Sequence, residues 1–373
     1  MSLKILHTAD VHLGAKFLSL GRKGEEMRTR LLEVFDDTVD LAIRERVNLF
    51  LIAGDLFDSD RVSTSLIDRV ARGLQNLLDA DIPVLVSPGT HDPYGEHSIW
   101  RADGLAAIEN LTVFKSEEML PVRFPELDCT VYGNANVKPF ANRYPLADLR
   151  PCDDSRWRIG MLHASFEIPD VTDDTYVATS AHIEKCGMDY VALGHYHSLS
   201  DRSAGDVAAF YSGSPEMIKM RKGEFGHVLL VNFDRDATRA QPVKLGKCAY
   251  EELTIKAEDM GVAGLTSMIE SLADPDKALH VFIEGVRRLD YPDIGKLIDS
   301  VSEMFFHVLL TDRSCAAPSS LQPDSYPEGS PARLYLEVLR EKLIGASDAE
   351  RDEIVDAMQV GLSMLADGDA TCV

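Results

Sequence analysis

Short apolar runs alternate with longer amphipathic stretches over the first half of the chain. The apolar runs lie at residues 4–8, 49–53, 84–86, 159–162 and 190–193. Residues 25–46 and 63–79 read instead as amphipathic helices. Buried strands of a parallel sheet read as continuous apolar runs and alternate with helices along the chain. The pattern therefore predicts an α/β fold.

The pattern changes near residue 245, which predicts a second domain. Shorter strands at 208–211 and 228–231 suit a two-sheet α/β sandwich over residues 1–245. Strand-like runs and helical stretches then alternate, at 252–255, 265–272, 279–283, 294–305 and 307–310. This β-α-β-α-β order predicts a small α+β domain over residues 250–313.

Residues 314–331 are rich in Ser and Pro and predict a flexible or loosely packed linker before a helical pair at 332–366. The first helix follows Ser330 and Pro331, an N-cap and a first-turn proline. The second opens with Ser347 and Glu350 at capping-box spacing. The two helices carry apolar stripes, Leu336, Leu339 and Leu343 on the first and Ile354, Met358, Leu362 and Leu365 on the second. Such stripes either pack within their own protein or dock a partner.

Polar clusters directly follow the apolar runs. They are Asp10 with His12, Gly54 with Asp55, Gly89 through Asp92, His163, and His195 with His197. Ligand sites of open α/β sheets lie outside the carboxyl ends of the strands, so these side chains converge. Two residues that stand two apart in extended chain leave on the same face, so we expect each Asp-x-His or His-x-His pair to hold one ion. The clusters together predict a dinuclear metal site, although each alone also suits a plain turn or a structural histidine.

The ligand set is imidazole and carboxylate without clustered thiolates, which suits manganese, iron or zinc. The remaining histidines lack such neighbours, and we assign them structural or surface roles: His7, His97, His182, His227, His280 and His307. Asp92 is interpreted as a turn or helix-cap residue.

The order of these motifs resembles that of the calcineurin-like metallophosphoesterases. The stretches at residues 7–14, 54–58 and 211–215 are similar to the DNA-repair exonuclease branch, which includes the bacterial SbcD nuclease subunit. The superfamily motifs span residues 5 to 215, and the branch resemblance extends to about residue 313. It implies a metallophosphoesterase sandwich followed by a capping domain that restricts access to the active site.

The resemblance implies two divalent metal ions, manganese first and iron or zinc as alternatives. Asp10, His12 and His197 would hold one ion, His163 and His195 the other, and Asp55 would bridge them. His91 would act as the general acid at the leaving oxygen, and Asp58 would orient His91 and hold it cationic.

Thr90 is the main departure from the family, because it occupies the position of an asparagine ligand of the second ion. A threonine hydroxyl is shorter than an amide and a poorer donor to a divalent ion. A weaker second site, a one-metal enzyme and a degenerate binding module therefore stay open.

The formal net charge of −23 is unusual for a protein that binds nucleic acid, since phosphates are normally neutralised by Lys and Arg. Any DNA contact must therefore be local. Lys219, Arg221 and Lys222 form one concentrated basic patch, which is either a DNA contact or a solvated loop.

The six cysteines are scattered, which fits a reducing compartment. No secretory signal pattern opens the sequence, and no apolar run approaches the roughly 18 residues of a membrane span. We expect a cytoplasmic protein without a membrane association.

These features together predict a metal-dependent phosphodiesterase that hydrolyses DNA, an exonuclease or endonuclease subunit in double-strand-break repair. The resemblance implies a homodimer and an SbcC-like coiled-coil ATPase that docks on the C-terminal helices. One alternative is a phosphodiesterase or phosphatase of small nucleotides or phosphoesters, because the same site cleaves many substrates. The other is a non-catalytic binding module.

Overall fold

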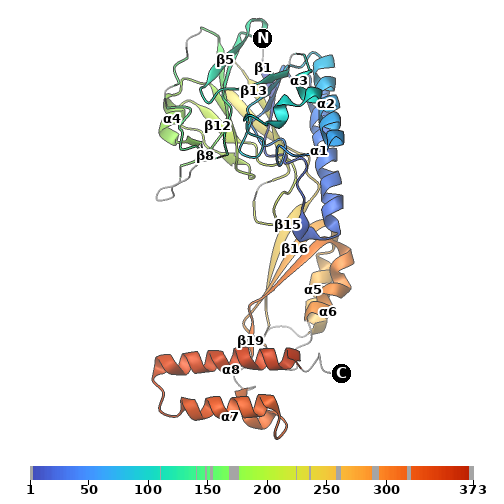
Figure 1. Cartoon of the computed structure of the whole chain (residues 1–373), viewed down its shortest axis with the longest axis vertical. Helices are drawn as coiled ribbons and strands as arrows, with labels where there is room; N and C mark the ends of the chain where they lie inside the picture. The colour runs from blue at the N-terminus through green and yellow to red at the C-terminus, as the bar shows by residue number, and fades with distance from the viewer. Residues whose placement is uncertain are drawn as a thin grey trace. The chain divides into compact units, whose positions relative to one another are not determined.

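The computed structural model describes residues 3–109, 111–139, 141–147, 149–151, 154–167, 176–223, 225–234, 237–257, 262–287, 294–316 and 321–368. These residues form two compact units, 1–248 and 249–373 (Figure 1). None of the described helices combines the length and the hydropathy that spanning a membrane requires.

The first unit contains two six-stranded sheets. One runs in the order β14 (Thr238–Lys244), β13 (His227–Phe233), β1 (Leu3–Thr8), β2 (Leu49–Ile52), β3 (Val84–Val86), β4 (Leu111–Val113). The other runs in the order β11 (Ser200–Asp201), β12 (Ala208–Tyr211), β10 (Tyr190–Gly194), β7 (Trp157–His163), β6 (Cys129–Gly133), β5 (Leu120–Phe124). Strands β1 through β4 pair in parallel, as do β6, β7, β10 and β12.

Alternate residues of the strands build two different cores. Ile5 of β1 packs with Ile159 of β7 in the apolar layer between the sheets. Leu6 points to the other face, where α1 (Lys23–Glu45) and α2 (Thr64–Asp79) contribute Phe35 and Leu74. The predicted two-sheet α/β sandwich is confirmed.

Shorter elements complete the first unit. They are η1 (Leu18–Leu20), η2 (Ile99–Arg101), α3 (Asp103–Ala106), η3 (Pro125–Leu127), β8 (Ser165–Phe166), β9 (Val177–Ala178) and α4 (Ser180–Lys185). Helix α4 packs Ile183 on the outer face of the second sheet, beside Leu193 of β10.

The second unit begins with three parallel strands and two helices. They are β15 (Ala249–Lys256), α5 (Val262–Ser271), β16 (Asp274–Glu284), α6 (Ile294–Val301) and β18 (Phe305–Asp312). The helix predicted to reach residue 305 ends instead at Val301, and the 3-10 turn η4 (Ser302–Met304) follows. Phe305 and Phe306 are both buried, and an extended chain can bury consecutive side chains because it places them on opposite faces. The last strand therefore begins at Phe305, earlier than the predicted residue 307.

The segment predicted as a loose linker is partly ordered. It holds β19 (Cys315–Ala316), which pairs with β17 (Val286–Arg287), and η6 (Pro323–Ser325), while residues 317–320 lie outside the described part. Leu321 is buried against Leu336, because this Ser- and Pro-rich stretch still carries apolar side chains that the helices can cover. Part of the stretch predicted as a flexible or loosely packed linker is therefore ordered, while most of the residues from 322 to 331 are exposed.

The helical pair consists of α7 (Pro331–Leu343) and α8 (Asp348–Gly368). The Ser330 hydroxyl accepts a hydrogen bond from the backbone N–H of Arg333, as an N-cap should. At the second helix the Glu350 carboxylate accepts the backbone N–H of Ser347 at 2.9 Å. The stripes pack on one another, with Leu336, Met358 and Leu362 buried between the helices.

Candidate metal centre

The carboxyl ends of four strands deliver the predicted ligands to one place. Asp10 follows β1, Asp55 follows β2, His163 ends β7 and His195 follows β10. Backbone hydrogen bonds tie the loops together, since the N–H of Asp10 donates to the Gly54 carbonyl at 3.0 Å and that of His12 donates to the Asp55 carbonyl at 3.0 Å. The site therefore rests on backbone held by both sheets.

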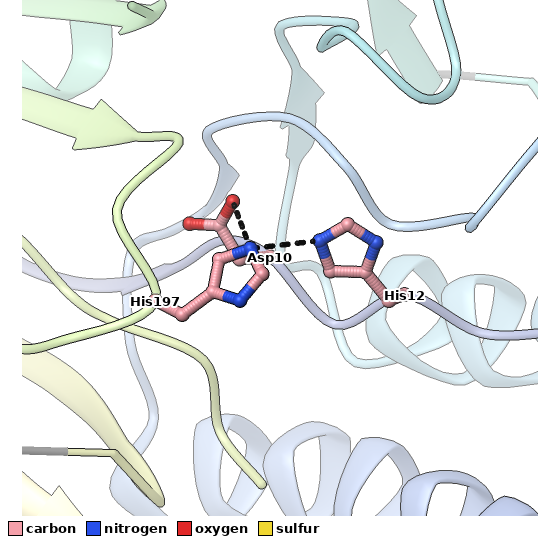
Figure 2. A group of neighbouring side chains, drawn as sticks. All are labelled: Asp10, His12 and His197. Carbon is pink, nitrogen blue, oxygen red and sulfur yellow. Dashed lines mark hydrogen bonds and ion pairs between the residues drawn. The ribbon is translucent and has the colours of Figure 1, made fainter. Parts of the chain in front are cut away.

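Asp10, His12 and His197 form the first cluster of possible ligand atoms (Figure 2). The Nε2 atoms of His12 and His197 lie 3.2 Å apart, and Nε2 of His197 lies 4.0 Å from Oδ1 of Asp10. Two imidazole nitrogens at this separation repel each other unless a proton or a cation lies between them. The donor set and its burial fit a divalent transition metal.

Asp10, Asp55 and His163 form a second cluster, and all three side chains are buried. Nε2 of His163 lies 3.1 Å from Oδ2 of Asp55, and Nε2 of His12 lies 3.9 Å from the same oxygen. Nδ1–H of His163 donates to the Ala53 carbonyl at 2.9 Å, which directs Nε2 toward Asp55. Asp55 thus stands between histidines of both clusters.

His195 and Thr90 take places next to these clusters. The ring of His195 meets the ring of His163 edge to face at 5.3 Å, and its backbone N–H donates to Asp10 at 3.0 Å. The Thr90 hydroxyl donates to Oδ2 of Asp55 at 3.2 Å. The structure therefore brings all seven predicted metal ligands together.

The two predicted ligand pairs differ in the structure. His195 and His197 do not share a cluster, whereas Asp10 and His12 do. The chain at Asp10 and His12 is not extended, however, because their φ angles are 54° and 53°. Asp55 and His195 also have positive φ angles, 51° and 116°. Such angles are strained for residues with side chains and persist where the surrounding fold imposes them, commonly at functional sites.

Gly54 and Gly89 leave room for the ligands. Gly54 has a φ of 90°, and a Cβ atom there would collide with the His163 ring. A Cβ atom at Gly89 would collide with the carboxylate and backbone of Asp55. The second cluster therefore depends on glycine at these positions.

Burial and mutual charge shift the pKa values of the clustered groups. Burial opposes ionisation of Asp55, but His163 and His12 hold its pKa well below the usual range. Burial would lower the pKa of His163, yet the Asp55 carboxylate raises it to about 9. Burial raises the pKa of Asp10 to about 6 against the pull of His163. The residues thus form a buried carboxylate and imidazolium array, whose protons a divalent cation would replace.

Asp58 and His91 meet differently from the prediction. The Asp58 carboxylate accepts a hydrogen bond from Nδ1–H of His12 at 3.1 Å. The same oxygen, Oδ1, lies 3.8 Å from Nδ1 of His91. His91 donates instead to the backbone carbonyl of Asp58 at 3.0 Å. The short loop brings the carbonyl closer to His91 than the carboxylate, which turns toward the buried imidazole of His12.

Asp92 has a structural role, as interpreted. Its buried carboxylate accepts the backbone N–H groups of Gly89, Asp55 and Phe57 at 2.7, 3.2 and 3.2 Å. It joins the turn after β3 to the loop that carries Asp55. Burial, followed by the charge of Asp55, raises its pKa to about 7.

Two further residues hold the backbone of Asp10 and His163, and no sequence motif gave them a role. The Ser214 hydroxyl donates to the Asp10 carbonyl at 2.7 Å, and the Asn136 amide donates to the His163 carbonyl at 3.1 Å. Ser214 lies in the stretch 211–215 that carries the family resemblance. Asn136 lies in an irregular loop, where no spacing rule marks it.

The basic patch lies within electrostatic reach of the first cluster. Lys219, Arg221 and Lys222 are exposed. Burial, then the charge of His12, and then Lys219 and Arg221 lower the pKa of His197 to about 2. The patch therefore raises the electrostatic potential at one side of the clusters.

Comparison with known families identifies the fold. The profile of the calcineurin-like phosphoesterases matches residues 3–199. The chain belongs to this family. Calcineurin-like phosphoesterases are hydrolases that bind divalent metal ions, and the ligand clusters lie within or beside the matched region.

Relatives of this calcineurin-like phosphoesterase include DNA-repair proteins. The DNA double-strand break repair protein Mre11 of Saccharolobus solfataricus is 26% identical over 76% of both chains. That of Aeropyrum pernix is 30% identical over 69% of this chain and 64% of its own. The uncharacterized metallophosphoesterase YhaO of Bacillus subtilis is 29% identical over 61% of this chain and 57% of its own. The chain thus spans less than two thirds of the length of the last two relatives. The matches to Mre11 proteins confirm the resemblance to the DNA-repair branch.

Proposed function

We propose that this protein is a metal-dependent phosphodiesterase that hydrolyses DNA, an SbcD-like exonuclease or endonuclease subunit in double-strand-break repair. The observation that carries the proposal is the pair of ligand clusters that share Asp10 at the strand ends. Asp10, His12 and His197 would hold one ion, and His163 and His195 the other. Asp55 would bridge them, and Thr90 would complete the second site or leave it to water. Manganese is the proposed ion, with iron or zinc as alternatives.

Bound divalent ions supply charge stabilisation at the phosphoryl oxygens and lower the pKa of an attacking water. His91 supplies the proton to the leaving oxygen. Its Nδ1–H donates to the Asp58 carbonyl, which leaves Nε2 to carry the proton that is transferred. The side chain is 48% exposed, so a substrate can reach it.

The names of the relatives and the local charge support DNA as the substrate. Two relatives are DNA double-strand break repair proteins. Lys219, Arg221 and Lys222 would contact phosphates of the strand near His197, since basic side chains position nucleic-acid backbones. We also propose that residues 250–313 form a capping domain that restricts access to the active site.

The assembly proposed for this enzyme includes a homodimer and an SbcC-like coiled-coil ATPase. Leu334 and Val338 are 53% and 57% exposed on one face of α7, apart from the buried stripe. One helical turn separates them, so they form a contiguous apolar strip that suits a coiled-coil partner. Cys129, Cys186 and Cys248 are buried, and the proposed location of the protein is the cytoplasm.

The formal charge of −23 favours a second candidate function, the hydrolysis of small phosphoesters. An acidic surface repels polyanions more than it repels a small monoanionic diester. Both candidates use the same metal centre, so substrate comparison separates them.

The test is hydrolysis of linear DNA, hairpin DNA and a small chromogenic phosphodiester with manganese. Wild type is compared with His91→Ala and with the exposed control His97→Ala. We expect the wild type and the control to cleave DNA, and His91→Ala to lose a factor of about 100 or more. Turnover of the small ester alone would overturn the DNA assignment. Fewer than one bound manganese per chain would instead support the non-catalytic module.

A further inference from the structure

A cavity of about 660 Å³ lies between α1 and α2. These helices lie side by side at one edge of the first unit (Figure 1). Four arginines line the cavity, Arg28 from α1, Arg61 from the loop before α2, and Arg69 and Arg72 from α2. Glu25 is the single acidic side chain among the described residues that line it.

The charge of this cavity opposes that of the chain, which carries −23. Among the described residues, Arg69 alone of the four arginines has a carboxylate partner, Asp36 at 2.6 Å. Arg28 donates to the Lys16 carbonyl and Arg72 to the Asp68 carbonyl, and neither contact neutralises a charge. The cavity therefore concentrates positive charge that Glu25 and Asp36 compensate only in part.

The cavity adjoins the loops that carry the candidate metal centre. Gly14 lines it, two residues beyond His12, and Arg61 lies three residues beyond Asp58. The backbone N–H of Asp58 donates to the Leu13 carbonyl at 2.9 Å, which holds the two loops together. The metal centre and the cavity therefore share the loops at residues 10–14 and 55–61.

We propose that this cavity binds phosphate groups of the DNA strand that flank the bond to be cleaved. The inference rests on the proposed function. Guanidinium groups bind phosphate oxygens through paired N–H donors, and the volume is of the order of 300–1,000 Å³ that holds a nucleotide-sized ligand. The N-terminus of the 16-residue helix α2 also opens here and adds its positive dipole end.

The test compares two triple variants that remove the same charge. One carries Arg28→Ala, Arg61→Ala and Arg72→Ala. The control carries Arg44→Ala, Arg123→Ala and Arg239→Ala, all exposed in the first unit and none of them lining the cavity. Affinity for a fluorescent DNA is measured in EDTA across salt concentrations. We expect the cavity variant to bind about tenfold more weakly at 0.1 M salt, with a salt slope smaller by about 2, and the control to match wild type.

Equal affinities for both triple variants would overturn the proposal. The same measurement with a mononucleotide separates two sources of phosphate. If the cavity variant loses mononucleotide binding but keeps its DNA affinity, the cavity serves a free nucleotide and the strand assignment is wrong. Circular dichroism melts verify folding, and the double variants Arg61→Ala/Arg72→Ala and Arg123→Ala/Arg239→Ala repeat the comparison if a triple variant unfolds.

Failure of the inference is distinguishable from failure of the proposed function. DNA binding in EDTA does not depend on hydrolysis. Wild-type turnover of DNA and of the chromogenic diester reports on the metal centre by itself. Cleavage by wild type with equal binding by both triple variants would overturn the cavity proposal alone.

Discussion

Single residues at the candidate metal centre are held in backbone conformations that the fold must impose. Asp10, His12 and Asp55 all have φ angles above 50°. Residue types alone indicated which side chains come together at this centre, because carboxylates and imidazoles after apolar runs are a recognisable pattern. The backbone angles and the roles of Ser214 and Asn136 could not be predicted, since they depend on contacts between distant loops.

Gly54→Ala is expected to destabilise the protein by about 3 kcal/mol or more, because a positive φ and a collision with the His163 ring add together. Gly21 is the matched control, since its φ is 52° and a Cβ atom there meets nothing within 4 Å. Gly21→Ala should cost about 1 kcal/mol. Urea unfolding measures both, and equal losses would show that the His163 contact does not matter.

Thr90→Asn is expected to raise occupancy of the second metal site at subsaturating manganese. The Thr90 hydroxyl bonds the Asp55 carboxylate, whereas an amide oxygen is a better ligand for a divalent ion. Manganese titration followed by elemental analysis measures the occupancy, with Thr29→Asn on the exposed face of α1 as the control. Unchanged occupancy would mean that Thr90 already serves adequately.

His7 should make stability depend on pH. Burial lowers its pKa to about 3, while an unfolded histidine titrates near 6.5. The contribution of the neutral His7 ring to the free energy of unfolding is therefore fully present above about pH 6.5. It falls as the pH drops toward 3, because the unfolded chain binds a proton that the folded chain does not. His7→Gln should show a shallower fall between pH 7 and pH 4 in EDTA than wild type or His97→Gln. Parallel curves would contradict this assignment.

At the scale of elements, the sequence predicted the five strands that carry the site. Buried parallel strands need uninterrupted apolar runs, and residues 49–53 and 190–193 show them. The end of α6 and the burial of Leu321 were not predicted, because both depend on tertiary contacts of Phe305, Phe306 and Leu321. Local propensity does not report such burial.

Substitutions on the two faces of α7 should differ in how much they lower the free energy of unfolding. Leu336 is fully buried against α8, so Leu336→Ala is expected to destabilise the second unit by about 2 kcal/mol or more. Leu334 is 53% exposed, and Leu334→Ala should cost less than about 1 kcal/mol. Thermal unfolding of the full chain measures both. Equal losses would show that α7 does not pack on α8 through the predicted stripe.

At the scale of the whole molecule, local charge departs from the net charge. The chain carries −23, yet the basic patch and the arginine-lined cavity lie beside the loops of the metal centre. Composition could not predict this distribution, because Arg28 and Arg61 are far apart in sequence and line one cavity only when α1 and α2 pack.

Metal affinity should depend on pH, because metal ions compete with protons on His163. The apparent affinity for the metal should therefore rise with pH up to about 9.

The most direct test of the metal centre is the number of manganese ions bound per chain at pH 8, by elemental analysis after gel filtration. Wild type should retain about two ions, and Asp55→Asn fewer than one, because Asp55 stands between histidines of both clusters. Asp60→Asn, in the neighbouring loop and absent from both clusters, is the control and should match wild type. Fewer than one ion in wild type, or equal retention by Asp55→Asn, would contradict the account.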